Sequence, residues 1–120
     1  MNRAEIKDSL SYLRLLTPSN PEDPKELYKN LAIKRIINLP KRGIGNKTME
    51  LIETQAEHDD TNMYEIIKNY EIGKGKAKTS LQAFVQLIEK YRAQVDKISI
   101  DQLLEQLLEE SGYLHMLRED

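Results

Sequence analysis

Apolar side chains recur along this chain at every third or fourth position, in six segments separated by glycine, proline or acidic breaks. That spacing places apolar residues on one face of an α-helix, and no run alternates with the period of two expected for a strand. We therefore predict an all-α fold: one domain over residues 1–120, a small bundle of about six helices. The expected helices are 4–16, 25–38, 46–58, 63–70, 77–95 and 100–111, with one more turn near Leu114 and Leu117.

Three of these apolar stripes predict how the helices pack. The stripes are Ile6, Leu10, Leu13 and Leu16 in the first, and Leu27, Leu31, Ile33, Ile36 and Ile37 in the second. The sixth carries Ile100 and a leucine face made of Leu103, Leu104, Leu107 and Leu108, which we expect on the inner side. We expect the first two stripes to face the core. The leucine face either packs on the fifth helix or is left exposed, in which case it could drive dimer formation.

Between the second and third helical segments lies a glycine turn, residues 39–48, with the sequence Leu-Pro-Lys-Arg-Gly-Ile-Gly-Asn-Lys-Thr. Gly43 and Gly45 permit a tight turn, and Ile44 between them can insert into the core. The backbone N–H groups nearby would then face outward, beside the positive dipole end of the next helix. Such a device binds anions, and a nucleic-acid backbone is the natural candidate. The expected contacts are Lys41, Arg42, Gly43, Ile44, Gly45, Asn46, Lys47 and Thr48, although Asn46 could instead cap the helix.

The charge distribution favours the same segment. The net charge of the chain is −2, which by itself indicates no class of partner. However, residues 27–49 hold six Lys or Arg and no Asp or Glu, whereas residues 101–120 hold six acids and a single Arg. This asymmetry predicts an anion-binding face near the glycine turn and a different role for the acidic C-terminal part.

A second glycine turn, residues 71–79, repeats the pattern of the first. Its Gly-Lys-Gly sequence precedes a leucine by the same spacing and also stands between two helical segments. Lys74, Lys76 and Lys78 make it a second candidate contact for DNA, but Lys74 replaces the apolar residue at the centre of the turn. The chain is thus expected to contain one or two turns of the helix-hairpin-helix kind.

Several function classes lack support in the sequence. The chain has no cysteine, which excludes disulfides and thiolate metal sites and fits a reducing compartment. His58 and His115 are far apart and lack neighbouring ligands, so we predict no metal site and no catalytic residue. No Walker A loop, zinc pattern or Ser/His/Asp order is present. No apolar run reaches membrane-spanning length and no secretory signal is expected, so no membrane partner is predicted.

Three stretches, taken in order, are similar to a known family. Residues 3–15 resemble the start of the 2B subdomain of UvrD/PcrA/Rep-type superfamily 1 DNA helicases. Residues 35–45, Arg-Ile-Ile-Asn-Leu-Pro-Lys-Arg-Gly-Ile-Gly, resemble the Gly-Ile-Gly segment of that subdomain, and residues 111–117 resemble a later 2B segment. Within the family, the PcrA branch of Gram-positive bacteria is the most similar.

The resemblance implies that this chain is a fragment, because 2B is an all-helical insertion in the second motor domain of these helicases. Their ATP and Mg²⁺ are bound elsewhere, on the motor cores, so the chain alone is expected to bind no cofactor and to be no enzyme. The parent protein would be an ATP-dependent 3′–5′ DNA helicase of the bacterial cytoplasm, associated with the nucleoid. In the family, the Gly-Ile-Gly segment contacts duplex DNA ahead of the fork, which carries over to residues 41–48.

The sequence therefore predicts a regulatory subdomain that contacts the phosphate backbone of double-stranded DNA, without sequence preference, at a duplex/single-strand junction. Its other partners would be the remaining helicase domains. The alternative is a protein-interaction module that docks on the motor domains or on an accessory protein. A free-standing helix-hairpin-helix DNA-binding protein is a third interpretation.

Overall fold

A computed structural model describes residues 1–119, and all of its regular structure is helical. Within those residues no strand occurs, so the predicted all-α class is confirmed. The seven helices of this part of the chain are α1 (Arg3–Leu15), α2 (Leu27–Ile36), α3 (Asn46–His58), α4 (Met63–Asn69), α5 (Gly75–Arg92), α6 (Ile100–Glu110) and α7 (Tyr113–Glu119). The helix found beyond the expected six is α7, where only one further turn was predicted.

Several helices begin where a polar side chain can cap them. The Asn2 side chain accepts the Glu5 N–H, and Glu5 bonds back to the Asn2 N–H, which forms a complete capping box for α1. The side chains of Asn62 and Ser99 likewise accept a backbone N–H from the first turn of α4 and α6, respectively. By contrast, α3 and α5, which follow the two glycine turns, have no side-chain cap at all.

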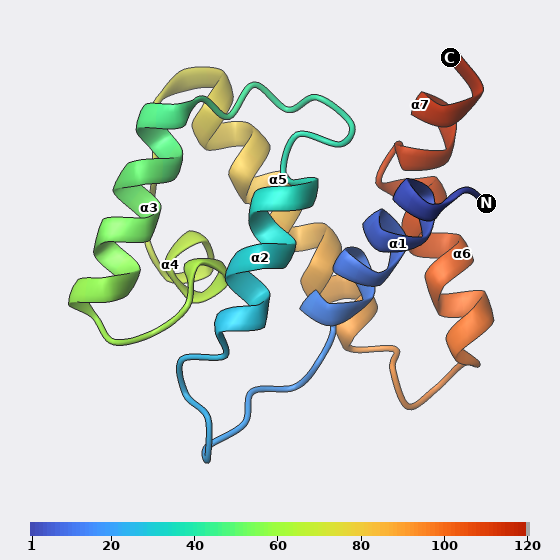
Figure 1. Cartoon of the computed structure of the whole chain (residues 1–120), viewed down its shortest axis with the longest axis horizontal. Coiled ribbons are helices and arrows are strands. Elements are labelled where there is room, and N and C mark those ends of the chain that lie inside the picture. The colour runs from blue at the N-terminus through green and yellow to red at the C-terminus, as the bar shows by residue number, and fades with distance from the viewer. Residues whose placement is uncertain (120) are drawn as a thin grey trace.

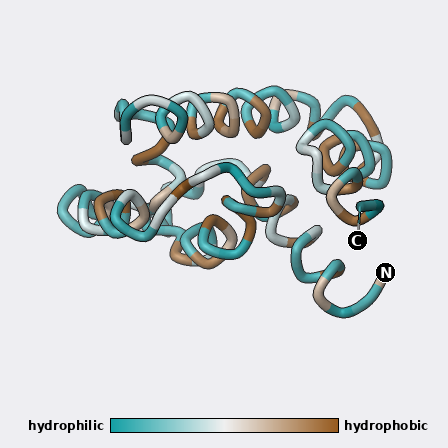
Figure 2. Tube along the Cα trace, turned by 90° about the horizontal axis from the view of Figure 1, so that it is seen from above, coloured by the Kyte–Doolittle hydropathy of each residue, from teal (hydrophilic) through white to brown (hydrophobic). Residues whose placement is uncertain are grey.

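The helices pack against one another around a single hydrophobic core. Helix α1 lies against α2 and α6, α4 lies against α2, α3 and α5, and α6 lies against α5 and α7. Figure 1 shows α2 in front of α5, with α1 and α7 on the side away from α3. In Figure 2, hydrophobic and hydrophilic stretches alternate along the helices, as expected where each helix buries only one face.

The predicted core faces of α1 and α2 are wrong in part. Ile6 and Leu10 on α1, and Leu27 and Leu31 on α2, are exposed. In their place α1 buries Asp8 and Tyr12. The reason is a set of polar contacts that periodicity cannot reveal, since the buried groups find hydrogen-bonding partners on α2, on the glycine turn and on α7.

The leucine face of α6 is not exposed, which corrects the expectation of a dimer surface there. Leu103, Leu107 and Leu108 are all buried, and Leu104 is half-buried against the core. Their burial follows from the position of α6 between α1, α5 and α7. Ile100, which was expected inside with these leucines, is exposed because it is the first residue of α6. Within residues 1–119, no helix is both long enough and apolar enough to cross a membrane.

Candidate nucleic-acid interface

The first glycine turn leaves α2, crosses one end of the molecule and delivers the chain into α3 (Figure 1). Ile44 is only 5% exposed and belongs to the core cluster, as the sequence predicted. Gly43 has a φ of 74°, a left-handed conformation that favours glycine. The turn is therefore fixed to the core at its centre while the residues on either side of Ile44 stay at the surface.

Asn38 holds this turn in shape, a role that our sequence analysis missed. Its Oδ1 accepts the N–H groups of Arg42 and Ile44 at 3.2 and 3.1 Å, and its Nδ2 donates to the Ile44 carbonyl at 2.8 Å. A single side chain thus satisfies three backbone groups that no helix can satisfy. The available signal was an asparagine just after an apolar helix and before a glycine turn, a position typical of such local bonds.

Arg42 was predicted to contact phosphate, but its side chain points inward. One guanidinium nitrogen donates to the carbonyls of Ile36 and Ile37 at 2.9 and 3.0 Å, and the other donates to the Tyr12 hydroxyl at 2.8 Å. The guanidinium also lies 4.8 Å from the centroid of the Phe84 ring. These carbonyls end α2, where a cation is favoured by the helix dipole. In this structure the Arg42 side chain therefore serves as an internal anchor for the turn.

Behind the turn, a second layer of polar contacts joins α1 to α7. Tyr12 donates to the Leu39 carbonyl at 2.6 Å, while Asp8 accepts from Tyr113 at 2.8 Å and from Arg35 at 2.7 Å. Burial is the main cause that raises the pKa of Tyr113 above its usual range, and the hydrogen bond to Asp8 raises this pKa further. The Tyr113 hydroxyl therefore stays protonated, and can donate, at neutral pH. The turn therefore rests on a rigid and satisfied support.

The outer side of the turn is basic and its backbone is open. Lys41 and Lys47 are exposed, and within residues 1–119 neither forms an ion pair. Gly45 occupies the N-cap position of α3 and Asn46 is the first helical residue, so Asn46 does not cap the helix. In the same described part of the chain, no protein hydrogen bond engages the N–H groups from Gly45 to Thr48. Thr48 itself is half-buried. The N-terminus of α3 is thus free to receive an anion.

The second glycine turn resembles the first in outline and differs at its centre. Gly73 and Gly75 have φ values of 81° and 58°, and Lys74 stands at the N-cap of α5. The buried residue here is Ile72, one position before the first glycine, so Lys74 is exposed. Figure 1 shows α3 and α5 beginning at the same end of the molecule.

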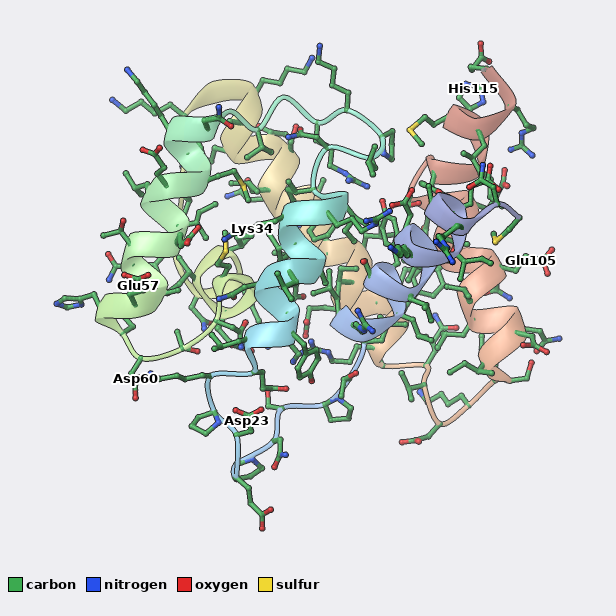
Figure 3. The ribbon with its side chains drawn as sticks, in the orientation of Figure 1. Asp23, Lys34, Glu57, Asp60, Glu105 and His115 are labelled. Carbon is green, nitrogen blue, oxygen red and sulfur yellow. The ribbon has the colours of Figure 1, made fainter. Side chains whose placement is uncertain are left out.

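Three lysines accompany the second turn. Lys74 and Lys76 are exposed, while Lys78 is half-buried and forms an ion pair with Glu71 at 3.3 Å. Acidic side chains such as Asp23 and Asp60 gather at the opposite end of the molecule, as Figure 3 shows. The two turns together present exposed lysines at one end of the molecule: Lys41, Lys47, Lys74 and Lys76.

The two histidines do not converge on any site. His58 lies beside Asp59 at 3.0 Å and His115 beside Glu119 at 3.4 Å, both at the surface. Among residues 1–119, no group of three or more His, Asp or Glu side chains could hold a metal ion.

Comparison with known proteins identifies relatives of this chain. No protein-family model matches it. It is 37% identical over 119 residues to the ATP-dependent DNA helicase PcrA of Bacillus subtilis, and 34% identical over 118 residues to the PcrA of Staphylococcus epidermidis. The PcrA of Staphylococcus aureus is 31% identical over 121 residues. These matches cover 97–99% of this chain and 15–16% of each helicase. The predicted resemblance to PcrA helicases is therefore confirmed, and the chain matches one segment of these much longer proteins.

Proposed function

We propose that this relative of a PcrA helicase segment is a 2B-type subdomain that binds the phosphate backbone of double-stranded DNA without sequence preference. One observation carries the proposal: the uncapped N-terminus of α3, held open at a rigid glycine turn between the exposed Lys41 and Lys47. The N–H groups of the turn and the two ammonium groups would bind adjacent phosphate oxygens.

Gly45 supports a ligand on this surface more directly than Gly43 does. The positive φ of Gly43 favours glycine on conformational grounds. Gly45 has an ordinary φ of −82°, and a Cβ built on it would meet no atom within 4 Å. Neither conformation nor packing requires a glycine at this N-cap, where Asn, Asp or Ser would stabilise the helix slightly better. A missing side chain does allow a phosphate to approach the backbone closely.

The second turn supplies a second contact in this proposal. Lys74 and Lys76 flank the uncapped start of α5, at the same end of the molecule as the first turn. Lys78, already paired with Glu71, contributes less. Two helix N-termini at one end can contact phosphates on the two strands of a duplex. All of the proposed contacts are made to phosphate groups, so no sequence preference is expected.

The wider setting is also proposed, and it rests on the resemblance to PcrA-type helicases. The parent protein would be an ATP-dependent 3′–5′ DNA helicase of the bacterial cytoplasm, associated with the nucleoid. Its ATP and Mg²⁺ sites would lie on the motor domains, outside this chain, so the chain alone would have no enzymatic activity. The DNA partner would be a duplex/single-strand junction, with the remaining helicase domains as neighbours.

The test is a titration of a fluorescent DNA hairpin with a single-stranded tail, followed by anisotropy at two salt concentrations. The double variant Lys41→Ala/Lys47→Ala should lose about tenfold in affinity and show a shallower salt dependence, because fewer counterions are released. The matched control is Arg3→Ala/Lys97→Ala, which removes two exposed cations elsewhere and should bind like the wild type. Equal losses in both variants would show that only the overall charge matters, and unchanged binding by both would reject the site.

The tail and the sequence of the hairpin provide the remaining arms of the experiment. Tighter binding to the tailed hairpin than to a blunt duplex would support junction recognition. Two hairpins of different sequence should bind equally, since phosphate contacts carry no base information. An affinity that depended strongly on sequence would contradict the proposed mode of contact.

A protein-interaction module is the second candidate function, and one observation favours it. Four apolar residues of α1 and α2 that were predicted to be buried are exposed to solvent instead, namely Ile6, Leu10, Leu27 and Leu31.

A further inference from the structure

Between α1 and α2 the surface forms a groove of about 460 Å³. Its apolar lining is Leu10, Leu31 and Ala32, of which Leu10 is 42% and Leu31 is 70% exposed. Leu31 has one of the most exposed large apolar side chains in the described residues. Leaving such side chains in water forgoes the free energy of burying them, so a cluster of them marks a contact surface.

The apolar strip extends beyond the groove at helical spacing. Ile6 precedes Leu10 by one helical turn on α1, and Leu27 precedes Leu31 by one turn on α2. Both preceding residues are also exposed. Two neighbouring helices thus offer apolar side chains at i and i+4, which is the arrangement that receives the apolar face of a third helix.

The rim of the groove is basic. Lys7, Arg14 and Arg35 line it, and no acidic residue does. Arg35 is paired with Asp8 at 2.7 Å, so its charge is largely compensated. Lys7 and Arg14 form no ion pair within residues 1–119. The groove therefore combines an apolar floor with two uncompensated positive charges at its edge.

We propose that this groove binds an acidic amphipathic helix of a partner protein. The apolar side chains of the partner helix would pack on Leu10 and Leu31, and its carboxylates would pair with Lys7 and Arg14. Charge complementarity selects an acidic partner, because a basic or neutral helix would leave both cations unpaired. Duplex DNA would satisfy the cations but would leave the apolar floor in contact with phosphates and water.

The groove and the glycine turns are separate surfaces. The groove is lined by residues of α1 and α2 and by none of the residues of either turn, whereas the turns lie at the end where α3 and α5 begin (Figure 1). Lys34, labelled in Figure 3, reaches from α2 toward α3, where it pairs with Glu53 at 3.0 Å. The proposal therefore does not rest on DNA binding, and both ligands can be held together.

The test uses a synthetic peptide with leucines at every third or fourth position and glutamates between them. It is titrated into the uniformly ¹⁵N-labelled chain, and amide chemical shifts are followed. Shifts at Leu10, Ser11, Leu31 and Ala32 should change, and a lysine-for-glutamate version of the peptide should bind at least about tenfold more weakly. Absence of shifts at these residues, or equal binding of both peptides, would overturn the proposal.

A matched pair of variants locates the site. Leu31→Glu should weaken binding of the acidic peptide by at least about tenfold, because it adds a repulsive charge and removes apolar contact. Leu51→Glu replaces a leucine of α3 that is 57% exposed and lies outside the groove, and it should bind like the wild type. Both leucines are exposed, so neither change should unfold the chain, which circular dichroism checks. Equal affinities of the two variants would refute the assignment.

Two further arms test other occupants of the groove. Adding the DNA hairpin should leave the peptide affinity and the groove resonances unchanged. Displacement of the peptide by DNA would identify the groove as part of the nucleic-acid surface and would overturn the proposal. Shifts of the same resonances with protein concentration alone, without peptide, would identify a second copy of the chain as the occupant and would overturn it too.

Discussion

Replacing Arg42 by methionine tests whether this residue anchors the glycine turn from inside. The guanidinium makes three short hydrogen bonds, to the Ile36 and Ile37 carbonyls and to the Tyr12 hydroxyl. Hydrogen bonds to charged groups are worth about 1.5–3 kcal/mol each. Methionine retains most of the apolar stem, so the change removes mainly the guanidinium, with its hydrogen bonds and its contact with the Phe84 ring.

The expected loss in the free energy of unfolding is about 3 kcal/mol, which is less than the sum of three bonds. The bonds share one guanidinium, and water can partly replace it because Arg42 is only half-buried. For a chain of this length, that loss corresponds to a fall of roughly 10 °C in melting temperature. Arg42→Lys keeps the charge but not the planar fork, and it should recover only part of the loss.

Urea unfolding followed by circular dichroism measures this loss, and Lys41→Met is the matched control. Lys41 is exposed and without an ion pair in the described residues, so its replacement should change stability by less than about 0.5 kcal/mol. The reasoning would be refuted if Arg42→Met were as stable as the control. It would be refuted more sharply if Arg42→Met lost DNA binding at unchanged stability, since Arg42 would then be a phosphate ligand.

Three further changes probe other parts of the structure. Asn38→Ala should cost about 2 kcal/mol and speed amide exchange across the turn, because three backbone groups lose their partner; unchanged exchange rates would contradict this. Gly112→Ala should cost about 1–2 kcal/mol in urea unfolding, because φ is 87° and the new Cβ would lie 3.2 Å from Pro40; wild-type stability would contradict it. Burial raises the pKa of Glu89, but the hydrogen bond from Tyr64 and two neighbouring cations hold that pKa below its usual range overall. The ionised Glu89 therefore stabilises the fold above its unfolded pKa, and this stabilisation is lost as the pH falls through the lower folded pKa. Glu89→Gln should flatten the fall in the free energy of unfolding between about pH 5 and 3. An unchanged slope would contradict this.

Local sequence accounts for the helices and for the anchor of the turn. The third helix, predicted over 46–58, has those bounds in the structure, because a glycine turn starts it and an acidic pair follows it. The insertion of Ile44 into the core was also predictable, since burying an apolar side chain is favourable and the flanking glycines permit the turn that this requires. Both features depend on neighbours in sequence, which periodicity and turn chemistry describe.

Contacts between residues distant in sequence decided which side chains of the turn and of α1 are buried. Arg42 is adjacent in sequence to the exposed Lys41, yet its side chain points inward. Its partners are the C-terminal carbonyls of α2 and the Tyr12 hydroxyl of α1, and these come together only when α1 packs on α2. The same packing buries Asp8 in place of Ile6, since Asp8 finds its partners 27 and 105 residues away. The sequence by itself determined the helices, the glycine turns and the kinship with a PcrA segment. Only the tertiary structure decided which cations face solvent and which apolar faces stay open, because a buried polar group is stable only where distant partners satisfy it.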